Sequence, residues 1–438
     1  LPIMKSLKLI FASITILAAA GASAQTTLEE MSLTPEKCGG VYYAYPVTES
    51  HNTPVPKGYE PFYVSHYGRH GSRFLISDTD YERVLVTLRK ADEADALTPL
   101  GKQVMEVMQE AWAEGEGRSG ELTPLGYRQH RAIAERLATN YPEIFKGNPE
   151  ITARSTQVMR CAHSMFSFVS GLMAHFPDIK PEMESSKRHM IYLCHSEPVS
   201  WDFNDNKLDE WRPEYTKFRA AMTNPDRLCR ALFNSEEYIK RHINPDELMW
   251  ELYWVAVDLQ NMETDRELLS IFTPEELFNL WRVFNAQFYI NNSSYPRSQG
   301  VNVDNARNLL NNIITTADEY VASGQNGATL RFGHDGNIVP LAAMMRIPGT
   351  YGYTNDIDSI HTVWNDWRVA PMAANLQIIF FRNKKGDVIA KAMLNEEEID
   401  FDIEGYKAPY YPWPVLRQYL QNLADTPSRN FMPEEFRN

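Results

Sequence analysis

The segment Ser65–Phe74 places one histidine, His70, between two arginines, Arg69 and Arg73. A guanidinium presents a planar set of N–H donors that matches the oxygens of a phosphate group. Nearby positive charge disfavours the imidazolium form, so His70 is expected to stay neutral and nucleophilic in acidic solution. Gly71 has no Cβ, which predicts a sharp backbone turn and a close approach of phosphate. The segment therefore predicts attack on a phosphoryl group, and the alternative is a buried structural histidine held by surface arginines.

Two further sets of polar residues follow strand-like runs. His334 and Asp335 come directly after the run 328–332, and Arg154 to Arg160 overlaps the end of another run at 150–156. A histidine can donate a hydrogen bond to a phosphoryl oxygen, and a carboxyl group can protonate a departing alcohol. A His-Asp pair is also common in turns and helix caps, so the pair alone is not specific. The position of the pair directly after a predicted strand makes it a candidate for a functional site.

Each of these sets lies between a predicted strand and a predicted helix. Residues 158–173 have the apolar periodicity of an amphipathic helix, and a helix is predicted after Asn337 with Pro340 in its first turn. The runs 376–382 and 388–394 are predicted to form a hairpin. In open α/β sheets, ligands bind beyond the carboxyl ends of the strands. We therefore expect residues 69–73, 154–160 and 334–335 to meet at one edge of a sheet.

Helix starts are marked by Thr-Pro and Asn-Pro pairs. Thr98-Pro99 and Thr123-Pro124 fit an N-cap followed by the first helical position, and Asn244-Pro245 and Thr273-Pro274 have the same form. The region 181–292 is rich in Trp, Tyr, Glu and helix formers. Strand-helix units on both sides of it predict an α/β core with a mainly parallel sheet and a helical insertion.

Composition limits the partners. The chain has 438 residues and a formal net charge of −14, which argues against non-specific binding to nucleic acid or to an anionic membrane. A polyanionic substrate would need a local cationic site. Four cysteines permit up to two disulfides in an oxidising compartment, while a buried free thiol is an equal alternative for Cys161. Their spacing matches no zinc pattern, and we expect no metal and no cofactor.

The first 24 residues are predicted to be a leader and a signal peptide. Lys5 and Lys8 precede an apolar stretch at 9–20, and small residues up to Ala24 provide a cleavage site. The apolar stretch is short for a bilayer-spanning anchor, which is the alternative. The mature protein is therefore expected to be secreted or periplasmic, with no membrane association after cleavage.

Together these motifs resemble the histidine acid phosphatases, the branch of the phosphoglycerate-mutase-like superfamily that includes phytases and multiple inositol polyphosphate phosphatases. The resemblance covers residues from about 60 to 395. It is carried, in chain order, by Arg69-His70-Gly71-Ser72-Arg73, by Leu122-Thr123-Pro124-Leu125-Gly126 with Gln129, by Arg154-Ser155-Thr156 through Arg160, and by Gly333-His334-Asp335. The ordered set is more specific than any one motif.

The resemblance implies a role for each matching residue. It makes His70 the nucleophile that becomes phosphohistidine and Asp335 the proton donor. It places Arg69, Arg73, Arg160 and His334 around the transferred phosphoryl group. Arg160 is chosen over Arg154 because the catalytic arginine of the family is the second of the two. The implied division is an α/β core at 25–180 and 301–438, with a helical cap at 181–300.

Two departures from the family pattern affect the substrate. The proline usual after the first motif is absent, since Phe74-Leu75-Ile76 follows, and the chain carries His334-Asp335 where animal inositol polyphosphate phosphatases carry His-Ala-Glu. We predict an exported phosphomonoesterase that acts on phytate or other inositol polyphosphates through phosphohistidine. A broad-specificity acid phosphatase is the closest alternative. A mutase-like phosphotransferase is a weaker alternative. A non-catalytic protein that binds phosphorylated ligands is the alternative from a different functional class. The oligomeric state is left open.

Overall fold

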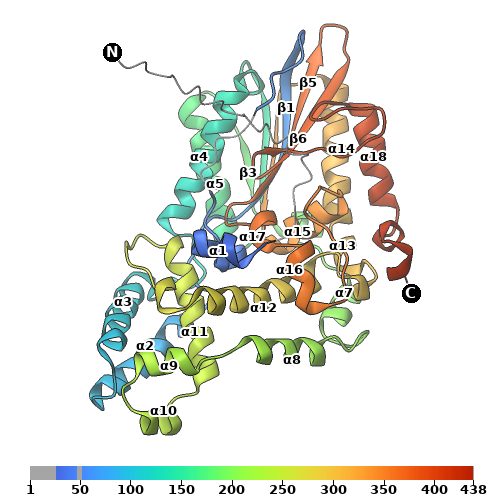
Figure 1. Cartoon of the computed structure of the whole chain (residues 1–438). Helices are drawn as coiled ribbons and strands as arrows, with labels where there is room; N and C mark the ends of the chain where they lie inside the picture. The colour runs from blue at the N-terminus through green and yellow to red at the C-terminus, as the bar shows by residue number, and fades with distance from the viewer. Residues whose placement is uncertain (1–25, 47–51, 438) are drawn as a thin grey trace, which may run out of the picture.

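The structure is a computed structural model that describes residues 26–46 and 52–437. It is built around one mixed β-sheet between layers of helices (Figure 1). The strands are β1 (Tyr59–Arg69), β2 (Glu150–Ser155), β3 (Glu182–Glu184), β4 (Gly327–Gly333), β5 (Asn375–Asn383), β6 (Val388–Leu394), β7 (Glu397–Glu398) and β8 (Tyr411–Pro412). They lie in the order β3-β2-β4-β1-β5-β6-β7, and β8 pairs with β6. The expected parallel pairing holds for β3, β2, β4 and β1, while the β5–β6 hairpin, as predicted, and its neighbours are antiparallel.

The central strands are buried on both faces, and apolar residues alternate in them with a few buried polar ones, such as His66 of β1 and Arg331 of β4. Every residue of β4 is buried, and so are the last nine of β1. The parallel register pairs Arg69 of β1 with Gly333 of β4, and Ser155 of β2 with Phe332 of β4. The carboxyl ends of these strands therefore coincide. This register brings the segments that begin at His70, Thr156 and His334 to one edge of the sheet.

Helices cover both faces of the sheet. One face carries α4 (Pro124–Asn140) and α5 (Met159–His175), and the other carries α14 (Arg307–Ser323), α15 (Asp335–Met344) and α18 (Trp413–Asp425). Successive strand residues serve opposite layers: Val64 packs in the cluster that contains α4 and α5, while Tyr63 packs in the cluster that contains α14 and α18. This alternation makes both faces of the sheet apolar, as a three-layer α/β/α arrangement requires.

A third apolar cluster joins helices from two parts of the chain below the sheet (Figure 1). It contains α2 (Thr79–Glu93), α3 (Pro99–Gly115), α9 (Asp226–Leu232), α11 (Pro245–Asp258) and α12 (Pro274–Asn292). The remaining helices are α1 (Leu28–Leu33), α6 (Met190–Leu193), α7 (Pro198–Asn204), α8 (Arg212–Met222), α10 (Glu236–His242), α13 (Val301–Asp304), α16 (Ile360–Val363) and α17 (Asp366–Val369). Helices α2 and α3 thus share a core with the segment 181–300. The division at residues 180 and 300 stays a prediction.

Local sequence signals fix most helix starts. The Thr98, Thr123 and Thr273 side chains each accept a hydrogen bond from the first turn of α3, α4 or α12, as expected. The prediction for Pro340 is wrong, because α15 begins at Asp335 and Pro340 lies inside it. The helix starts earlier because β4 ends at Gly333 and only His334 separates the two elements. All four cysteines are free thiols, so the disulfides that the composition permits are not formed.

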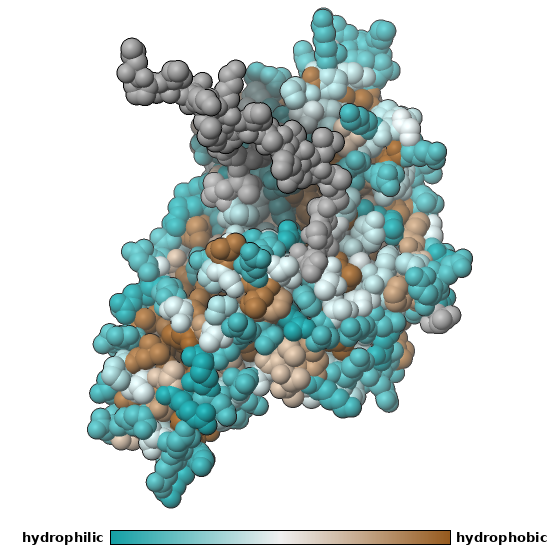
Figure 2. Space-filling model, viewed as in Figure 1, coloured by the Kyte–Doolittle hydropathy of each residue, from teal (hydrophilic) through white to brown (hydrophobic). Residues whose placement is uncertain are grey.

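The face of the molecule shown in Figure 2 is mostly hydrophilic, with apolar residues scattered over it. Exposed apolar side chains include Ile76, Met159 and Trp201. Among the helices of residues 26–46 and 52–437, none combines the length and apolar character needed to cross a membrane. The predicted signal peptide, residues 1–24, lies outside the described residues.

Candidate active site

The six residues singled out from the sequence come together at the carboxyl ends of β1, β2 and β4. The rings of His70 and His334 lie edge to face, with centroids 5.8 Å apart. The Nη2 atom of Arg69 lies 2.6 Å from Oδ2 of Asp335. The charges of Arg73 and Arg160 act on His70, on His334 and on each other. Parallel neighbouring strands account for this meeting of three chain segments.

His70 is buried and has one nitrogen engaged by its own loop. Its Nδ1 lies 2.9 Å from the carbonyl oxygen of Gly71. In the tautomer in which Nδ1–H donates this hydrogen bond, Nε2 carries the lone pair of the ring. Burial, followed by the charges of Arg69, Arg160 and Arg73, holds the pKa of His70 well below its ordinary value of 6.5. The neutral ring is therefore a nucleophile even in acidic solution.

The three arginines carry buried N–H groups that no described residue accepts. Arg69 Nη1 donates to the carbonyl oxygens of Val41 and Ala370, and its Nη2 is paired with Asp335, while its Nε has no hydrogen-bond partner in the described parts of the chain. The same holds for Nε of Arg73 and of Arg160. Buried donors are normally satisfied, because each unpaired donor costs about 1–3 kcal/mol. Donors on three cations around one histidine fit an anion with several oxygens.

His334 and Asp335 connect the end of β4 to α15. Thr156 Oγ1 lies 3.1 Å from Nε2 of His334, and the His334 backbone N–H donates to the Tyr67 hydroxyl over 3.2 Å. Burial lowers the pKa of His334 to about 4, against the opposing charge of Asp335. Burial is the largest influence on Asp335 and raises its pKa, but the charges of Arg69, His334 and Arg73 and the hydrogen bond from the Gly336 backbone together outweigh burial, so that the net shift of the pKa is downward. In the substrate-free protein Asp335 is therefore a carboxylate.

Arg154 lies apart from this cluster. Its guanidinium donates to the Glu182 backbone oxygen over 2.6 Å and to the Glu182 carboxylate over 2.7 Å. It thereby ties the edge strand β3 to β2. Arg160, by contrast, lies in the first turn of α5, directly after the end of β2. The geometry agrees with the choice of Arg160 over Arg154 for the site.

Gly71 also has a packing contact that the sequence did not indicate. A Cβ at this position would lie 2.6 Å from the Gly126 carbonyl oxygen, and a Cβ at Gly126 would collide with the Ser72 carbonyl oxygen. The two glycines allow the start of α4 to pack against the backbone of the His70 loop. Gln129 of the same helix accepts from the Ser72 backbone N–H over 2.8 Å. The contact that requires Gly71 is thus with the protein backbone, and its φ lies outside the left-handed region.

Sequence reasoning missed several residues that support the site. Ser164 Oγ accepts from the Gly71 N–H over 3.1 Å, and the Tyr42 hydroxyl accepts from Arg73 Nη2 over 3.1 Å. Asn261 accepts from the Ser72 hydroxyl over 2.6 Å. Ser164 could have been found as the residue one turn after Arg160, on the same face of the helix. Tyr42 and Asn261 carry no local signal, because packing alone brings them to the site.

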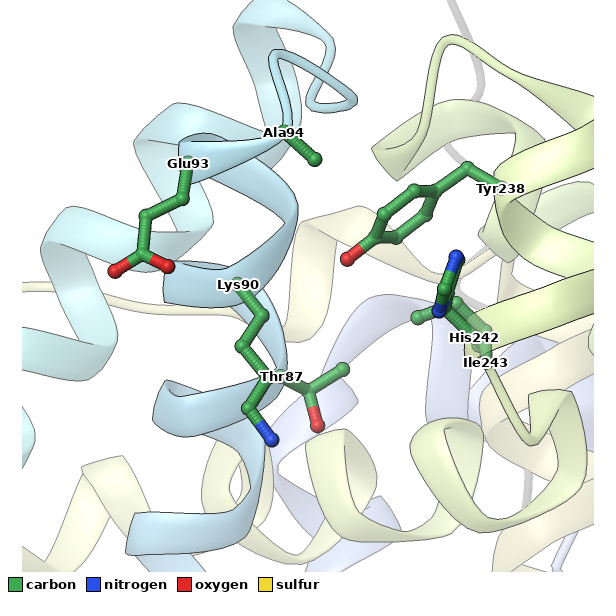
Figure 3. Close-up of a pocket in the computed structure, with 7 residues that line it drawn as sticks. All are labelled: Thr87, Lys90, Glu93, Ala94, Tyr238, His242 and Ile243. Atoms are coloured by element: carbon green, nitrogen blue, oxygen red, sulfur yellow. The ribbon is translucent and has the colours of Figure 1, made fainter.

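The described residues contain no cluster that could bind a metal ion, and the cavity of Figure 3 lies away from the six site residues. No group of three or more His, Cys, Asp or Glu side chains among them could hold a metal ion. A cavity of about 510 Å³ lies between α2 and α10 (Figure 3). It is lined by Thr87, Lys90, Glu93, Ala94, Tyr238, His242 and Ile243. None of the six site residues belongs to it.

Comparison with known proteins defines the class. The family model of the histidine phosphatase superfamily (branch 2) matches residues 68–391, which is more than half of the chain. The chain belongs to this superfamily and is a phosphatase that hydrolyses phosphate monoesters.

Solved structures share the fold at low sequence identity. The multiple inositol polyphosphate phosphatase of Bifidobacterium longum, in complex with phosphate, has a TM-score of 0.72 and 18% identity over 88% of this chain and 97% of its own. The phytase from D. castellii has a TM-score of 0.61 and 15% identity over 89% of this chain and 85% of its own. A phytase from Klebsiella sp. ASR1 has a TM-score of 0.52 and 13% identity over 86% and 98%. The predicted phosphoglycerate-mutase-like α/β fold is confirmed.

Proposed function

We propose that this protein is an exported phosphomonoesterase that hydrolyses inositol polyphosphates through a phosphohistidine on His70. One observation supports the proposal most: Arg69, Arg73 and Arg160 each have a buried Nε–H group with no hydrogen-bond acceptor among the described residues, and these groups surround a neutral histidine. A dianionic phosphoryl group supplies acceptors for these donors and offsets the charge of the cations. His334 adds a further donor.

The reaction proceeds in two displacements. The Nε2 lone pair of His70 attacks phosphorus in line with the ester oxygen, the P–N bond forms, and the P–O ester bond breaks. Asp335 gives its proton to the departing alcohol oxygen. Water then attacks the phosphohistidine and gives a proton to the Asp335 carboxylate, the P–N bond breaks, and inorganic phosphate leaves with His70 and Asp335 regenerated. Arg69, Arg73 and Arg160 stabilise the equatorial oxygens in both steps, and no metal ion takes part.

The ion pair between Arg69 and Asp335 links substrate binding to the proton on Asp335. In the substrate-free site Arg69 keeps the pKa of Asp335 low. A bound phosphate dianion brings negative charge close to the carboxylate and shares Arg69 with it, and both effects raise the pKa of Asp335. Asp335 thus becomes a proton donor when the substrate is present.

The substrate class rests on charge beside the site. Ser185 contacts Ser155 through their hydroxyl groups at the carboxyl end of β2, and the segment that follows contains Lys187, Arg188 and His189. Arg188 and His189 pair with Glu184, whereas Lys187 is exposed and forms no ion pair with the described residues. A substrate with several phosphates can engage this cation in addition to the central arginines. Structures of the same fold carry the names phytase and multiple inositol polyphosphate phosphatase.

Export rests on the sequence of residues 1–24, which have the charged, apolar and small-residue regions of a signal peptide. Fractionation of cells that produce the full chain tests it. The expected result is processed protein outside the cytoplasm, and unprocessed cytoplasmic protein would contradict the proposal.

A substrate panel tests the activity. Phosphate release is measured from inositol hexakisphosphate, glycerol phosphate and a sugar phosphate, with and without EDTA. We expect release from all three, the highest kcat/KM for inositol hexakisphosphate, and no loss with EDTA. Equal kcat/KM values would favour a broad-specificity acid phosphatase. Phosphate binding without turnover would favour a non-catalytic binding protein.

A further inference from the structure

The segment 35–46 crosses the active site although it lies outside the residues that match the family model. It contains the 3-10 helix η1 (Pro35–Tyr42), and we call residues 35–46 the N-terminal strap. The carbonyl oxygen of Val41 accepts from Arg69 Nη1, and the hydroxyl of Tyr42 accepts from Arg73 Nη2 over 3.1 Å. The strap thus touches two of the three site arginines.

The strap is held in place from several sides. Gly40 has φ +56°, and a Cβ there would collide with the buried Asp366 carboxylate, so the backbone passes directly against that side chain. The Tyr253 hydroxyl donates to the Cys38 carbonyl over 2.6 Å, and Met372 N–H donates to the Tyr43 carbonyl over 2.8 Å. These contacts fix the backbone on both sides of Tyr42.

The Tyr42 side chain faces the phosphate-binding arginines and not only the core. Its ring lies 4.7 Å from the Arg73 guanidinium and packs against Trp254 and Phe284, with centroids 5.8 and 6.2 Å away. Burial has the largest influence on the pKa of Arg69, Arg73 and Arg160, and Tyr42 is one of the neighbours that raise the pKa of each. The residue is only half-buried.

The hydroxyl of Tyr42 has a hydrogen to give. A tyrosine hydroxyl has one donor and acceptor lone pairs, and the bond from Arg73 uses an acceptor. No other described residue accepts from the hydroxyl of Tyr42. We propose that Tyr42 is a substrate-binding residue, whose hydroxyl donates to a non-bridging oxygen of the phosphoryl group held by Arg73 and Arg160. This inference rests on the proposed function, because that function places the phosphoryl group at these arginines.

Replacement of the hydroxyl alone tests the contact. Tyr42→Phe keeps the ring against Trp254 and Phe284 but removes the donor. A hydrogen bond to a charged group is worth enough to predict about tenfold weaker binding of inorganic phosphate and an about tenfold higher KM, with a smaller change in kcat. Tyr43→Phe is the matched control, because Tyr43 is the next strap residue and its ring packs on Trp367 instead. The control is expected to bind phosphate like the wild type.

Phosphate binding is measured by calorimetry on the full chain, and kcat and KM are measured on p-nitrophenyl phosphate. Unchanged phosphate binding in Tyr42→Phe overturns the inference, as does tighter binding, which would mean that the hydroxyl competes with phosphate for Arg73. Equal losses in both tyrosine variants would also overturn it, since they would show a general effect of the strap. Weaker phosphate binding in Tyr42→Phe alone, in a protein that hydrolyses no phosphate ester, would support the contact and refute the proposed function.

Discussion

Buried cations occur in two parts of the sheet, and their partners differ. In the antiparallel part, Lys391 pairs with Glu398 at 2.8 Å, and Arg136 of the neighbouring helix α4 pairs with Glu396 at 2.6 Å. Each cation there has its own carboxylate.

At the carboxyl ends of β1, β2 and β4, the arginines Arg69, Arg73 and Arg160 share one paired carboxylate, Asp335, within the described residues. A buried charge without a partner costs several kcal/mol, so unbalanced charge is not a device for stability. The paired cations tie elements of the fold together, whereas the arginines around His70 have fewer carboxylates than charges. Arg331 of β4 is also buried without a carboxylate, but Asn312, Ser65 and Thr316 accept its hydrogen bonds. Under the proposed function, the arginines around His70 receive an anion instead. The following predictions test this distinction, from the largest expected effect to the smallest.

The largest effect is expected for His70→Ala in the unbalanced region. No other group in this site can form the phosphoenzyme, so kcat should fall by at least about 10³-fold. The fold should be retained, because within residues 26–46 and 52–437 the one hydrogen bond of the ring is with its own loop. Phosphate release and circular dichroism are measured on the purified variant. Substantial turnover by a folded variant would rule out the covalent mechanism.

Asp335→Asn removes the one carboxylate that pairs with these arginines in the part of the chain that the structure describes. The proton donor is lost, so kcat/KM for inositol hexakisphosphate should fall by about 10²-fold or more. p-Nitrophenyl phosphate should be hydrolysed with a much smaller loss, because its phenolate leaves without a proton. The rate of phosphoenzyme formation is measured on both substrates, and the two losses are compared. Equal losses would assign Asp335 to positioning of Arg69 or His334.

Arg160→Ala and Arg154→Ala separate the two kinds of cation within one motif. Arg160 has no ion pair among the described residues, and its loss should lower kcat/KM by about 10²-fold. Arg154 is paired with Glu182, and its loss should change kcat/KM by less than about threefold. Steady-state kinetics on one substrate measures both. A larger effect of Arg154→Ala would reverse the choice between the two arginines.

Lys391→Met tests the balanced region. Its ammonium is fully buried, and removal leaves Glu398 without its partner, which should lower the free energy of unfolding by about 3 kcal/mol. The value of kcat/KM should not change. Urea unfolding measures stability, and the double variant Lys391→Met with Glu398→Gln should recover part of the loss. A drop in kcat/KM of the folded Lys391 variant would contradict the separation of the two regions.

Acid stability provides the last test, in which the expected change per pH unit is the smallest. Burial lowers the pKa of His66 and of His130 to about 3, so both are neutral in the native state above that pH. The unfolded chain binds these protons below pH 6.5, and the free energy of unfolding should fall by about 1.4 kcal/mol per pH unit for each histidine as pH falls from 6.5 towards 3. His66→Leu should reduce this slope by about that amount. An unchanged slope would show that His66 is charged in the native state.

The candidate site could be predicted far better than its surroundings. The sequence singled out His70, His334 and Asp335 because each follows an apolar strand and because their ordered motifs resemble one family, and the structure brings the three residues together; their roles stay predictions. The strand ends coincide as expected, and the Thr-Pro helix starts are in place. Pro340 was misplaced, since helical periodicity does not show how short the connection from the strand is. Tyr42 was missed, because its hydroxyl reaches Arg73 only through the path of the N-terminal strap.

The sequence by itself determined the long strands β1, β2, β4, β5 and β6, the Thr-Pro helix starts and the order of the motifs, because these depend on residues within a few positions of one another; it did not indicate the short strands β3, β7 and β8. Only the tertiary structure decided that Arg69 lies beside Asp335, that Arg154 ties β2 to β3 while Arg160 enters the site, and that Gly71 makes room for the backbone of α4. Burial and charge balance depend on side chains brought together from distant segments. Packing of distant segments therefore decides which of the arginines has a carboxylate partner and which has none among the described residues.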